Sequence, residues 1–186
     1  MKDVIVIGGG VAGLQAAVFT AKAGEETLVL DTDESLVYST SNIQNLVGHD
    51  SIGGQELLKK AREKLSDFDG EHREEEVESL EKDGDTFRVE TGENSYQAEY
   101  VVLASAGMTD YIDIEEVDFE EGKEGPYWMD QHVVTDGDNC VLEGLYAAGL
   151  INYWVYQTSF AIGDGAKAAV NLLSDKYGEP YQDHDT

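Results

Sequence analysis

The sequence is poor in cysteine, in basic residues and in long apolar runs, and each shortage excludes a class of protein. Cys140 is the only cysteine in 186 residues, so no intrachain disulfide can form, structural or catalytic. Lysine and arginine together number 12, too few for a protein that neutralises nucleic-acid phosphates with a basic face. No stretch approaches the roughly 20 apolar residues of a membrane span. The apolar start at Asp3–Ile7 lacks a cationic leader, so we expect a soluble, cytoplasmic protein without a signal peptide.

Acidic residues dominate what is present. Aspartate and glutamate number 39, which gives a formal net charge of −27 and a pI near 4.1. This charge disfavours docking on anionic lipid. The hydrophobic content of 41% is too high for a disordered acidic tail and indicates a folded domain coated in carboxylates. We interpret the coat as a halophilic adaptation to a cytosol of high salt, where screening removes the self-repulsion of the surface.

Unbroken apolar runs predict a parallel sheet that is buried on both faces. The expected strands are Val4–Ile7, Thr27–Leu30, Tyr100–Leu103 and Leu145–Ala148. Helical spacing over 11–23, 54–68 and 157–177 predicts helices on one face of this sheet, whereas 35–51 is predicted to be a loop. Alternating residues around a turn at Asp83-Gly84 predict a small antiparallel sheet over 71–98 on the other face. The predicted fold class is a three-layer α/β, Rossmann-like FAD/NAD-binding fold, with residues 1–186 as a single domain.

The first strand and first helix are joined by a glycine-rich turn. Gly8-Gly-Gly-Val-Ala-Gly13 satisfies the spacing G-x-G-x-x-G. Gly8 is expected to make the turn, Gly10 to let a pyrophosphate reach the backbone, and Gly13 to let helix and strand pack closely. The helix N-terminus at Val11 and Ala12 would supply N–H groups and partial positive charge to the phosphates. The pattern therefore predicts a dinucleotide-binding site.

An acidic residue ends the second predicted strand, at the position where such folds bind a ribose. Asp31 lies 18 residues after Gly13, and its carboxylate is expected to accept hydrogen bonds from both ribose hydroxyls. A carboxylate here would repel a 2′-phosphate, so a 2′-phosphorylated ribose is disfavoured. The glycine motif and the acid alone do not separate FAD from NAD.

Several segments resemble the low-molecular-weight thioredoxin reductases, FAD-dependent pyridine nucleotide-disulfide oxidoreductases, in family order. They are Gly8–Gly24, Asn42–Gly48, Gly53–Leu58, Tyr100–Gly107, Asp130 and Thr135, Glu143–Gly149, Tyr156-Gln157 and Gly163–Ala169. The resemblance implies an FAD cofactor, with NAD less favoured. It adds Ala104, Gly149 and the position of Leu150 to the expected binding site. It also implies that the closing helix directs the backbone of Gln157 and Thr158 at the pyrimidine edge of the flavin.

The sequence departs from this family in ways that affect function. The family inserts an NADPH-binding domain after the position of Gly107, and here the chain continues directly to Met108. The Cys-x-x-Cys is missing too, so the resemblance does not imply a self-sufficient thioredoxin reductase. Leu150 stands where the family has an Asp that bonds the ribityl chain, and Leu36–Thr40 stands where it has paired glycines. An arginine that usually precedes Gln157 is also absent. FAD is therefore expected to sit differently, to bind weakly or to have been lost.

Other single residues invite weaker interpretations. Cys140 lacks a second cysteine or a nearby base, so we predict that it is unreactive. His49 and His132 are interpreted as loop histidines rather than acids or bases. The aromatic pairs Tyr127-Trp128 and Tyr153-Trp154 would either contact the flavin, replace lost core or form a protein interface. No metal-ligand spacing is present, and no catalytic residue can be named.

Two functional hypotheses remain open. The first is an FAD-binding oxidoreductase that is reduced by an external donor or a redox partner protein. The alternative is a non-catalytic dinucleotide-binding module, a sensor or assembly unit, that takes FAD or NAD. We also predict a homodimer at high salt, because loss of the donor domain would expose apolar surface near Gly107–Asp113 and the aromatic pairs.

Overall fold

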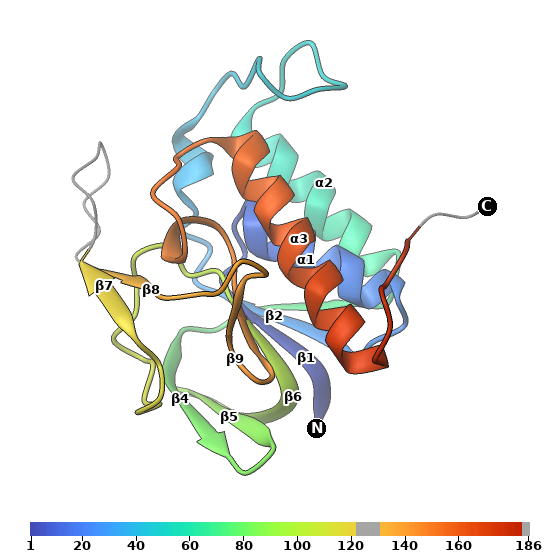
Figure 1. Cartoon of the computed structure of the whole chain (residues 1–186). Coiled ribbons are helices and arrows are strands. Elements are labelled where there is room, and N and C mark those ends of the chain that lie inside the picture. The colour runs from blue at the N-terminus through green and yellow to red at the C-terminus, as the bar shows by residue number, and fades with distance from the viewer. Residues whose placement is uncertain (122–130, 184–186) are drawn as a thin grey trace.

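The protein folds into three layers around a central sheet, in a computed structural model that describes residues 1–121 and 131–183 (Figure 1). The helices are α1 (Val11–Lys22), α2 (Gly54–Ser66) and α3 (Thr158–Tyr177), with two short 3₁₀ helices, η1 (Leu36–Ser39) and η2 (Gly149–Ile151). The strands are β1 (Lys2–Ile7), β2 (Thr27–Asp31), β3 (Glu71–Glu74), β4 (Val77–Asp83), β5 (Thr86–Thr91), β6 (Ser95–Leu103), β7 (Phe119–Glu121), β8 (Gln131–Val133), β9 (Cys140–Leu142) and β10 (Leu145–Ala147). The predicted fold class is confirmed.

The central sheet has the strand order β3-β2-β1-β6-β10-β9. All neighbours along it pair in parallel except β9, which runs antiparallel to β10. Strand β1 lies between β2 and β6, so the prediction that Val4–Ile7 is an interior strand is confirmed. The carboxyl ends of β1, β2, β6 and β10 consequently meet at one edge, where ligands bind in open α/β sheets.

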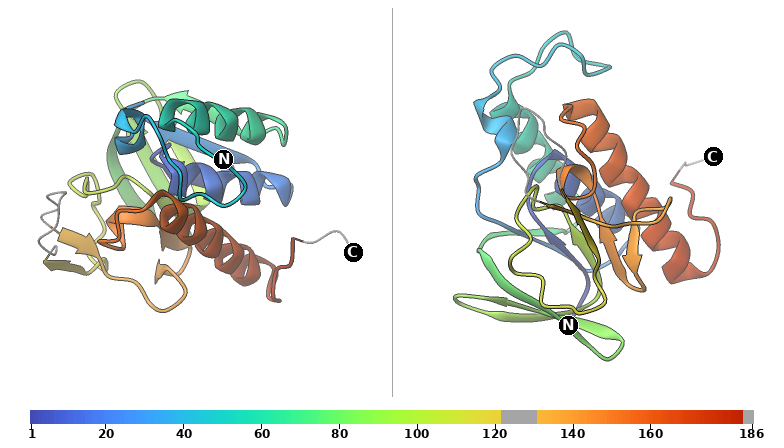
Figure 2. Two further views of the ribbon diagram at one scale, coloured as in Figure 1. Left: turned by 90° about the horizontal axis from the view of Figure 1, so that it is seen from above. Right: turned by 60° about the vertical axis from the view of Figure 1, so that its left-hand side comes forward.

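Alternation along the strands divides the core into two halves. Val4 and Val6 face the helices and pack with residues of α1 and α3 such as Leu14 and Leu172. Ile5 and Ile7 face the other side, against Phe87 and its neighbours on the β4–β5 hairpin. Because both faces are covered, successive strand residues are all apolar, which is the pattern that made these strands predictable. Figure 2 shows the helices grouped on one face of the sheet and the hairpin on the other.

The sequence-based boundary of the antiparallel sheet was wrong at its start. Glu71–Glu74 pairs in parallel with β2 and extends the main sheet, so the antiparallel part begins at Val77 rather than Glu71. Strand β3 is polar because it forms the edge of the sheet and is only partly buried. The expected strands at 95–98 and 100–103 are one continuous strand, β6, whose first part pairs antiparallel with β5 and whose second part pairs parallel with β1.

The chain between β6 and β10 forms a small two-stranded sheet, β7–β8. Before it, Tyr111 is buried and its hydroxyl lies 2.8 Å from Ser105 Oγ. Met108 is exposed. Of the large apolar side chains in the segment Gly107–Asp113, where an exposed apolar surface was expected, Met108 is exposed and Tyr111 is buried. No helix in the described ranges is long and apolar enough to cross a membrane.

Candidate functional site

A cleft of about 600 Å³ opens at the carboxyl ends of the central strands. Its walls come from the β1–α1 turn, the segment after β2, the turn after β6, the loop after β10 and the start of α3. This volume lies within the range of small-molecule and cofactor sites, roughly 300–1,000 Å³. The strand-order switch at β1 puts the cleft where dinucleotides bind in doubly wound folds.

Each of the three motif glycines, Gly8, Gly10 and Gly13, has a different structural role. Gly8 has a φ of +107°, which favours glycine, and a Cβ on it would overlap the Ala104 carbonyl. A Cβ on Gly13 would overlap the Gly8 carbonyl, so this glycine allows α1 to pack on β1. Gly10 differs, because a Cβ there would meet only Ser35 Oγ at 3.4 Å. The protein itself therefore tolerates a side chain at Gly10, and the space in front of it belongs to the cleft.

Two helices present their N-termini to the cleft without negative charge. Val11 and Ala12 begin α1, and Thr158 begins α3; all three line the cleft, and neither helix has an acid in its first turn. In contrast, α2 carries Glu56 there. The described lining residues include Asp31 and Glu34 but no lysine, arginine or histidine. An anion in this cleft would therefore be held by backbone N–H groups and helix dipoles rather than by basic side chains.

Asp31 ends β2 at the cleft wall and is only 6% exposed. Its Oδ2 accepts a hydrogen bond from Arg62 Nη2 at 3.2 Å and lies 3.4 Å from His72 Nε2. Burial raises the pKa of Asp31, but hydrogen bonds from His72 and the Gly9 amide, with the Arg62 charge, outweigh burial and hold the pKa below its ordinary value. The carboxylate is therefore ionised at neutral pH and can accept hydrogen bonds from a ligand.

The loop after β10 is fixed from behind by a buried acid. Asp164 accepts hydrogen bonds from the Gly149 amide at 2.7 Å and from Asn139 Nδ2 at 2.9 Å. Gly149 has a φ of +79°, and its amide is already occupied by Asp164. Leu150, the next residue, contributes an apolar side chain to the cleft. The polar contact that the resemblance implies at this position is thus absent from the side chain of Leu150.

The opposite wall comes from the segment between β2 and α2. Asn42 to Asn45 line it, and Asn45 Nδ2 donates a hydrogen bond of 2.9 Å to Gln157 Oε1. This contact joins the loop to the N-cap of α3 across the cleft mouth. Ala106, on the turn after β6, has a φ of +57° in the left-handed region. Strained residues of this kind gather at functional sites.

The structure brings ten of the eleven predicted site residues into this one cleft. They are Gly8, Gly10, Val11, Ala12, Asp31, Ala104, Gly149, Leu150, Gln157 and Thr158. Gly13 lies behind the wall in the α1–β1 contact. Sequence reasoning missed Gly9, Ser35 and Asn45, which line the cleft, and Arg62 and His72, which contact Asp31. Asn45 belongs to Asn42–Gly48, one of the segments that resemble the thioredoxin reductases, so the resemblance could have identified it as a site residue.

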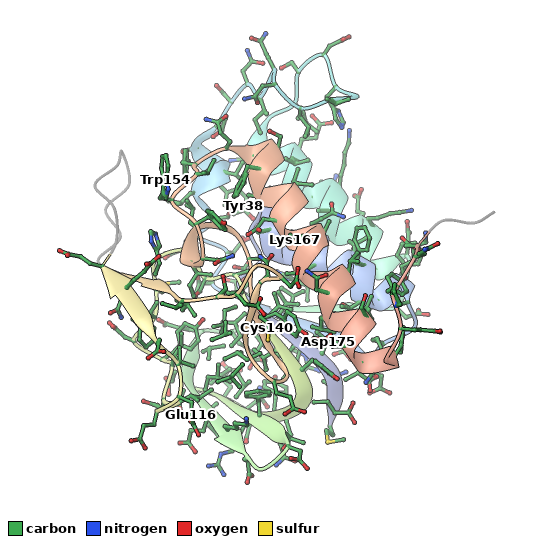
Figure 3. The ribbon with its side chains drawn as sticks, in the orientation of Figure 1. Tyr38, Glu116, Cys140, Trp154, Lys167 and Asp175 are labelled. Atoms are coloured by element: carbon green, nitrogen blue, oxygen red, sulfur yellow. The ribbon has the colours of Figure 1, made fainter. Side chains whose placement is uncertain are left out.

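The remaining candidates lie outside the cleft lining. Cys140 is partly buried on β9, and burial together with Asp136 raises the pKa of its thiol, which disfavours reactivity (Figure 3). His49 is exposed in the loop, and His132 is buried on β8. Tyr153 and Trp154 are exposed and do not line the cleft, whereas Tyr127 and Trp128 lie outside the described residues. No group of three or more potential metal ligands occurs in the described ranges.

Comparison with protein families matches residues 2–147 to the pyridine nucleotide-disulphide oxidoreductases. Among curated proteins, the chain is 27% identical over 159 residues to a thioredoxin reductase of Mycolicibacterium smegmatis, covering 78% of this chain and 51% of that protein. It is 29% identical over 157 residues to the thioredoxin reductase of Bacillus subtilis, covering 77% and 49%. The chain thus spans about half the length of the curated relatives that it matches.

Solved structures show the same fold. A thioredoxin reductase from Gloeobacter violaceus aligns with a TM-score of 0.81 at 16% identity, covering 100% of this chain and 98% of that one. The thioredoxin reductase of T. acidophilum aligns with a TM-score of 0.76 at 18% identity, covering 95% and 99%. At these identities, the likeness shows the fold alone.

Proposed function

Because this chain belongs to the pyridine nucleotide-disulphide oxidoreductase family, we propose that it is a flavoprotein oxidoreductase whose cleft holds FAD. The observation that carries the proposal is the cleft at the β1–α1 turn, where an open Gly10, two acid-free helix N-termini and an ionised Asp31 coincide. Thioredoxin reductases and their family are FAD-binding flavoproteins. FAD is therefore favoured over NAD, which the glycine motif alone would also accept.

The residues present fit most of an FAD molecule. The pyrophosphate would lie against the N–H groups of Val11 and Ala12, and the adenosine ribose would hydrogen-bond to Asp31. The flavin ring would lie toward Gln157 and Thr158, whose helix N-terminus stabilises negative charge. Leu150 is the exception, since it offers the ribityl chain no hydrogen bond. Bound FAD would supply two-electron redox chemistry, and the protein would hold and orient it.

We propose that electrons reach and leave the cofactor through an external donor or a redox partner. The chain has only Cys140, so it has no dithiol of its own to reduce a disulfide. We also propose that the chain lacks an NADPH domain after about residue 107. In support, β7 ends only 18 residues after the end of β6, at Glu121.

Titration of the purified protein with FAD in molar salt tests the proposal. We expect binding with a dissociation constant of about 1 μM or tighter, a free energy of roughly −8 kcal/mol. The measurement is the change in the visible flavin spectrum and in flavin fluorescence. Competition with NAD should displace FAD only at much higher concentration. A folded protein whose titration shows no change in either signal would contradict FAD binding.

The alternative, a non-catalytic dinucleotide-binding module, is favoured by Leu150. Because Leu150 offers the ribityl chain no hydrogen bond, FAD could bind here without being held in the position that electron transfer requires. The same titrated sample separates the two functions, since reduction of bound FAD coupled to any acceptor protein or small molecule supports the oxidoreductase. Binding of FAD without turnover with a range of donors and acceptors supports the module.

We further propose a homodimer at high salt, in a halophilic and cytoplasmic setting. Tyr153 and Trp154 are 47% and 54% exposed on the segment between η2 and α3, and large exposed rings of this kind anchor protein interfaces. Figure 3 places Trp154 on the outer side of this segment. At a net charge of −27, association should require salt, because molar ionic strength shortens the Debye length to about 3 Å. Sedimentation at several salt concentrations should show dimers that dissociate on dilution of salt; monomers throughout would contradict this.

A further inference from the structure

A cluster of charged and polar side chains lies behind Asp31, on the side away from the cleft. Arg62 of α2 reaches Asp31 Oδ2 at 3.2 Å and also bonds Asp33 Oδ1 through the same Nη2 atom. Tyr38 of η1 donates its hydroxyl to Asp33 Oδ1, and its ring centre lies 5.9 Å from the Arg62 guanidinium carbon. His72 of β3 lies 3.4 Å from Asp31 Oδ2. Asp31 is thus tied to α2, η1 and β3 at once.

The side-chain contacts of Asp31 use only one of its two carboxylate oxygens. The hydrogen bonds and ion pairs that the described side chains make with Asp31 all end on Oδ2. A Cβ on Gly9 would overlap this same oxygen, so the glycine-rich turn and Arg62 together enclose it. None of these side-chain contacts reaches Oδ1, and Asp31 lines the cleft wall. Arg62 does not line the cleft, so it acts on a ligand only through Asp31.

We propose that Arg62 is a positioning residue for nucleotide binding, which holds Asp31 so that Oδ1 receives the 2′,3′-diol of an adenosine ribose. The inference rests on the proposed dinucleotide function and names the part of the ligand that Arg62 controls. One guanidinium lies between two carboxylates, Asp31 and Asp33, so these three groups together carry one negative charge. That charge favours ribose hydroxyls as donors and disfavours a 2′-phosphate.

Removal of Arg62 is expected to change the position of the Asp31 carboxylate. Without Arg62, Asp31 and Asp33 would face each other with no cation between them, and like charges at this range repel. Asp31 would then turn away from the position that presents Oδ1 to the cleft. Arg62 hydrogen-bonds to Asp31 and Asp33 rather than to Val11 or Ala12, so we expect the pyrophosphate site to change much less than the ribose site. The loss should therefore depend on the ribose hydroxyls of the ligand.

Isothermal titration with ADP and with 2′,3′-dideoxyADP tests this dependence. For Arg62→Met we expect ADP to bind about tenfold more weakly, the loss typical of a disrupted hydrogen bond to a charged group, while the dideoxy ligand binds as to wild type. Arg62→Lys should recover part of the loss, because a lysine keeps the charge but not the planar fork. Arg88→Met is the matched control, since Arg88 pairs with Glu81 and Glu90 on the β4–β5 hairpin and does not line the cleft.

Four outcomes would overturn the inference. Equal losses for both ligands in Arg62→Met would show a general structural effect, and an unchanged ADP affinity would show no role. If Arg62→Met does not fold, as judged by circular dichroism, Arg62→Lys carries the test, because it keeps the positive charge without the planar fork and should weaken ADP partly while leaving the dideoxy ligand unchanged. Wild-type protein that binds FAD but does not distinguish ADP from dideoxyADP would overturn the inference alone. Wild type that binds neither FAD nor ADP would overturn the proposed function with it.

Discussion

Replacing Gly10 by valine is expected to abolish FAD binding, with at least a hundredfold loss of affinity and an intact fold. The backbone at Gly10 is extended, with φ −72° and ψ −178°, so a valine is allowed there. A Cβ would meet only Ser35 Oγ at 3.4 Å within the protein. The two valine methyl groups would instead fill the space in front of the α1 N-terminus, where the pyrophosphate has to lie.

Flavin titration and thermal unfolding of Gly10→Val, measured side by side, check this expectation. Gly137→Val is the matched control, because a Cβ at Gly137 would meet no other atom within 4 Å and Gly137 does not line the cleft. Both variants should unfold within a few degrees of wild type, and only Gly10→Val should lose FAD. FAD affinity equal to wild type in Gly10→Val would place the ligand elsewhere.

Replacing Gly165 by alanine is expected to destabilise the fold by roughly 3 kcal/mol, comparable to a severe overpacking of the core. Gly165 lies in the second turn of α3, a helix that packs beside α1 (Figure 1). A Cβ on it would overlap the Ala12 carbonyl, a backbone atom of α1 that cannot move without displacing the whole helix. Separation of α1 from α3 would also disturb the cleft, because both helices begin at its wall.

A second glycine in the same turn provides the control. Gly163→Ala meets no atom within 4 Å, and replacing a helical glycine by alanine stabilises a helix by up to about 1 kcal/mol. Urea unfolding should therefore shift the two variants in opposite directions, although the substitutions are identical and two residues apart. Destabilisation of both by the same amount would contradict the close α1–α3 contact as the cause.

The difference between Gly163 and Gly165 illustrates what the sequence could and could not predict. The helix over 157–177 followed from its spacing, and α3 begins and ends within a residue of that range. Which of its two glycines touches another helix depends on the crossing of α1 and α3, and no local pattern reports that contact. The β1–α1–β2 unit was predictable for the opposite reason, because burial on both faces leaves an unbroken apolar run.

The sequence analysis failed to identify strand β3 and the contacts of His72 and Arg62 with Asp31. Strand β3 has the sequence Glu-His-Arg-Glu, and as an edge strand it has no apolar period to detect. Its residue His72 approaches Asp31 from 41 positions away, and Arg62 does so from 31. Both residues were missed because strand pairing and helix packing bring them to Asp31, and their distance from Asp31 along the sequence gives no sign of this. The glycine motif and Asp31 were found because the turn that they form is local.

No lysine, arginine or histidine lines the cleft among the residues that the structure describes, so the surface charge can change without changing the site. In many anion-binding proteins, lysines and arginines bind the ligand. Substitutions that make such a protein more acidic can therefore also remove ligand-binding side chains. Here the charge that faces the cleft comes from peptide dipoles at α1 and α3, which every sequence with these helices possesses. Acidic substitutions on the surface can therefore bring the net charge to −27 without removing the groups that would bind an anion in the cleft.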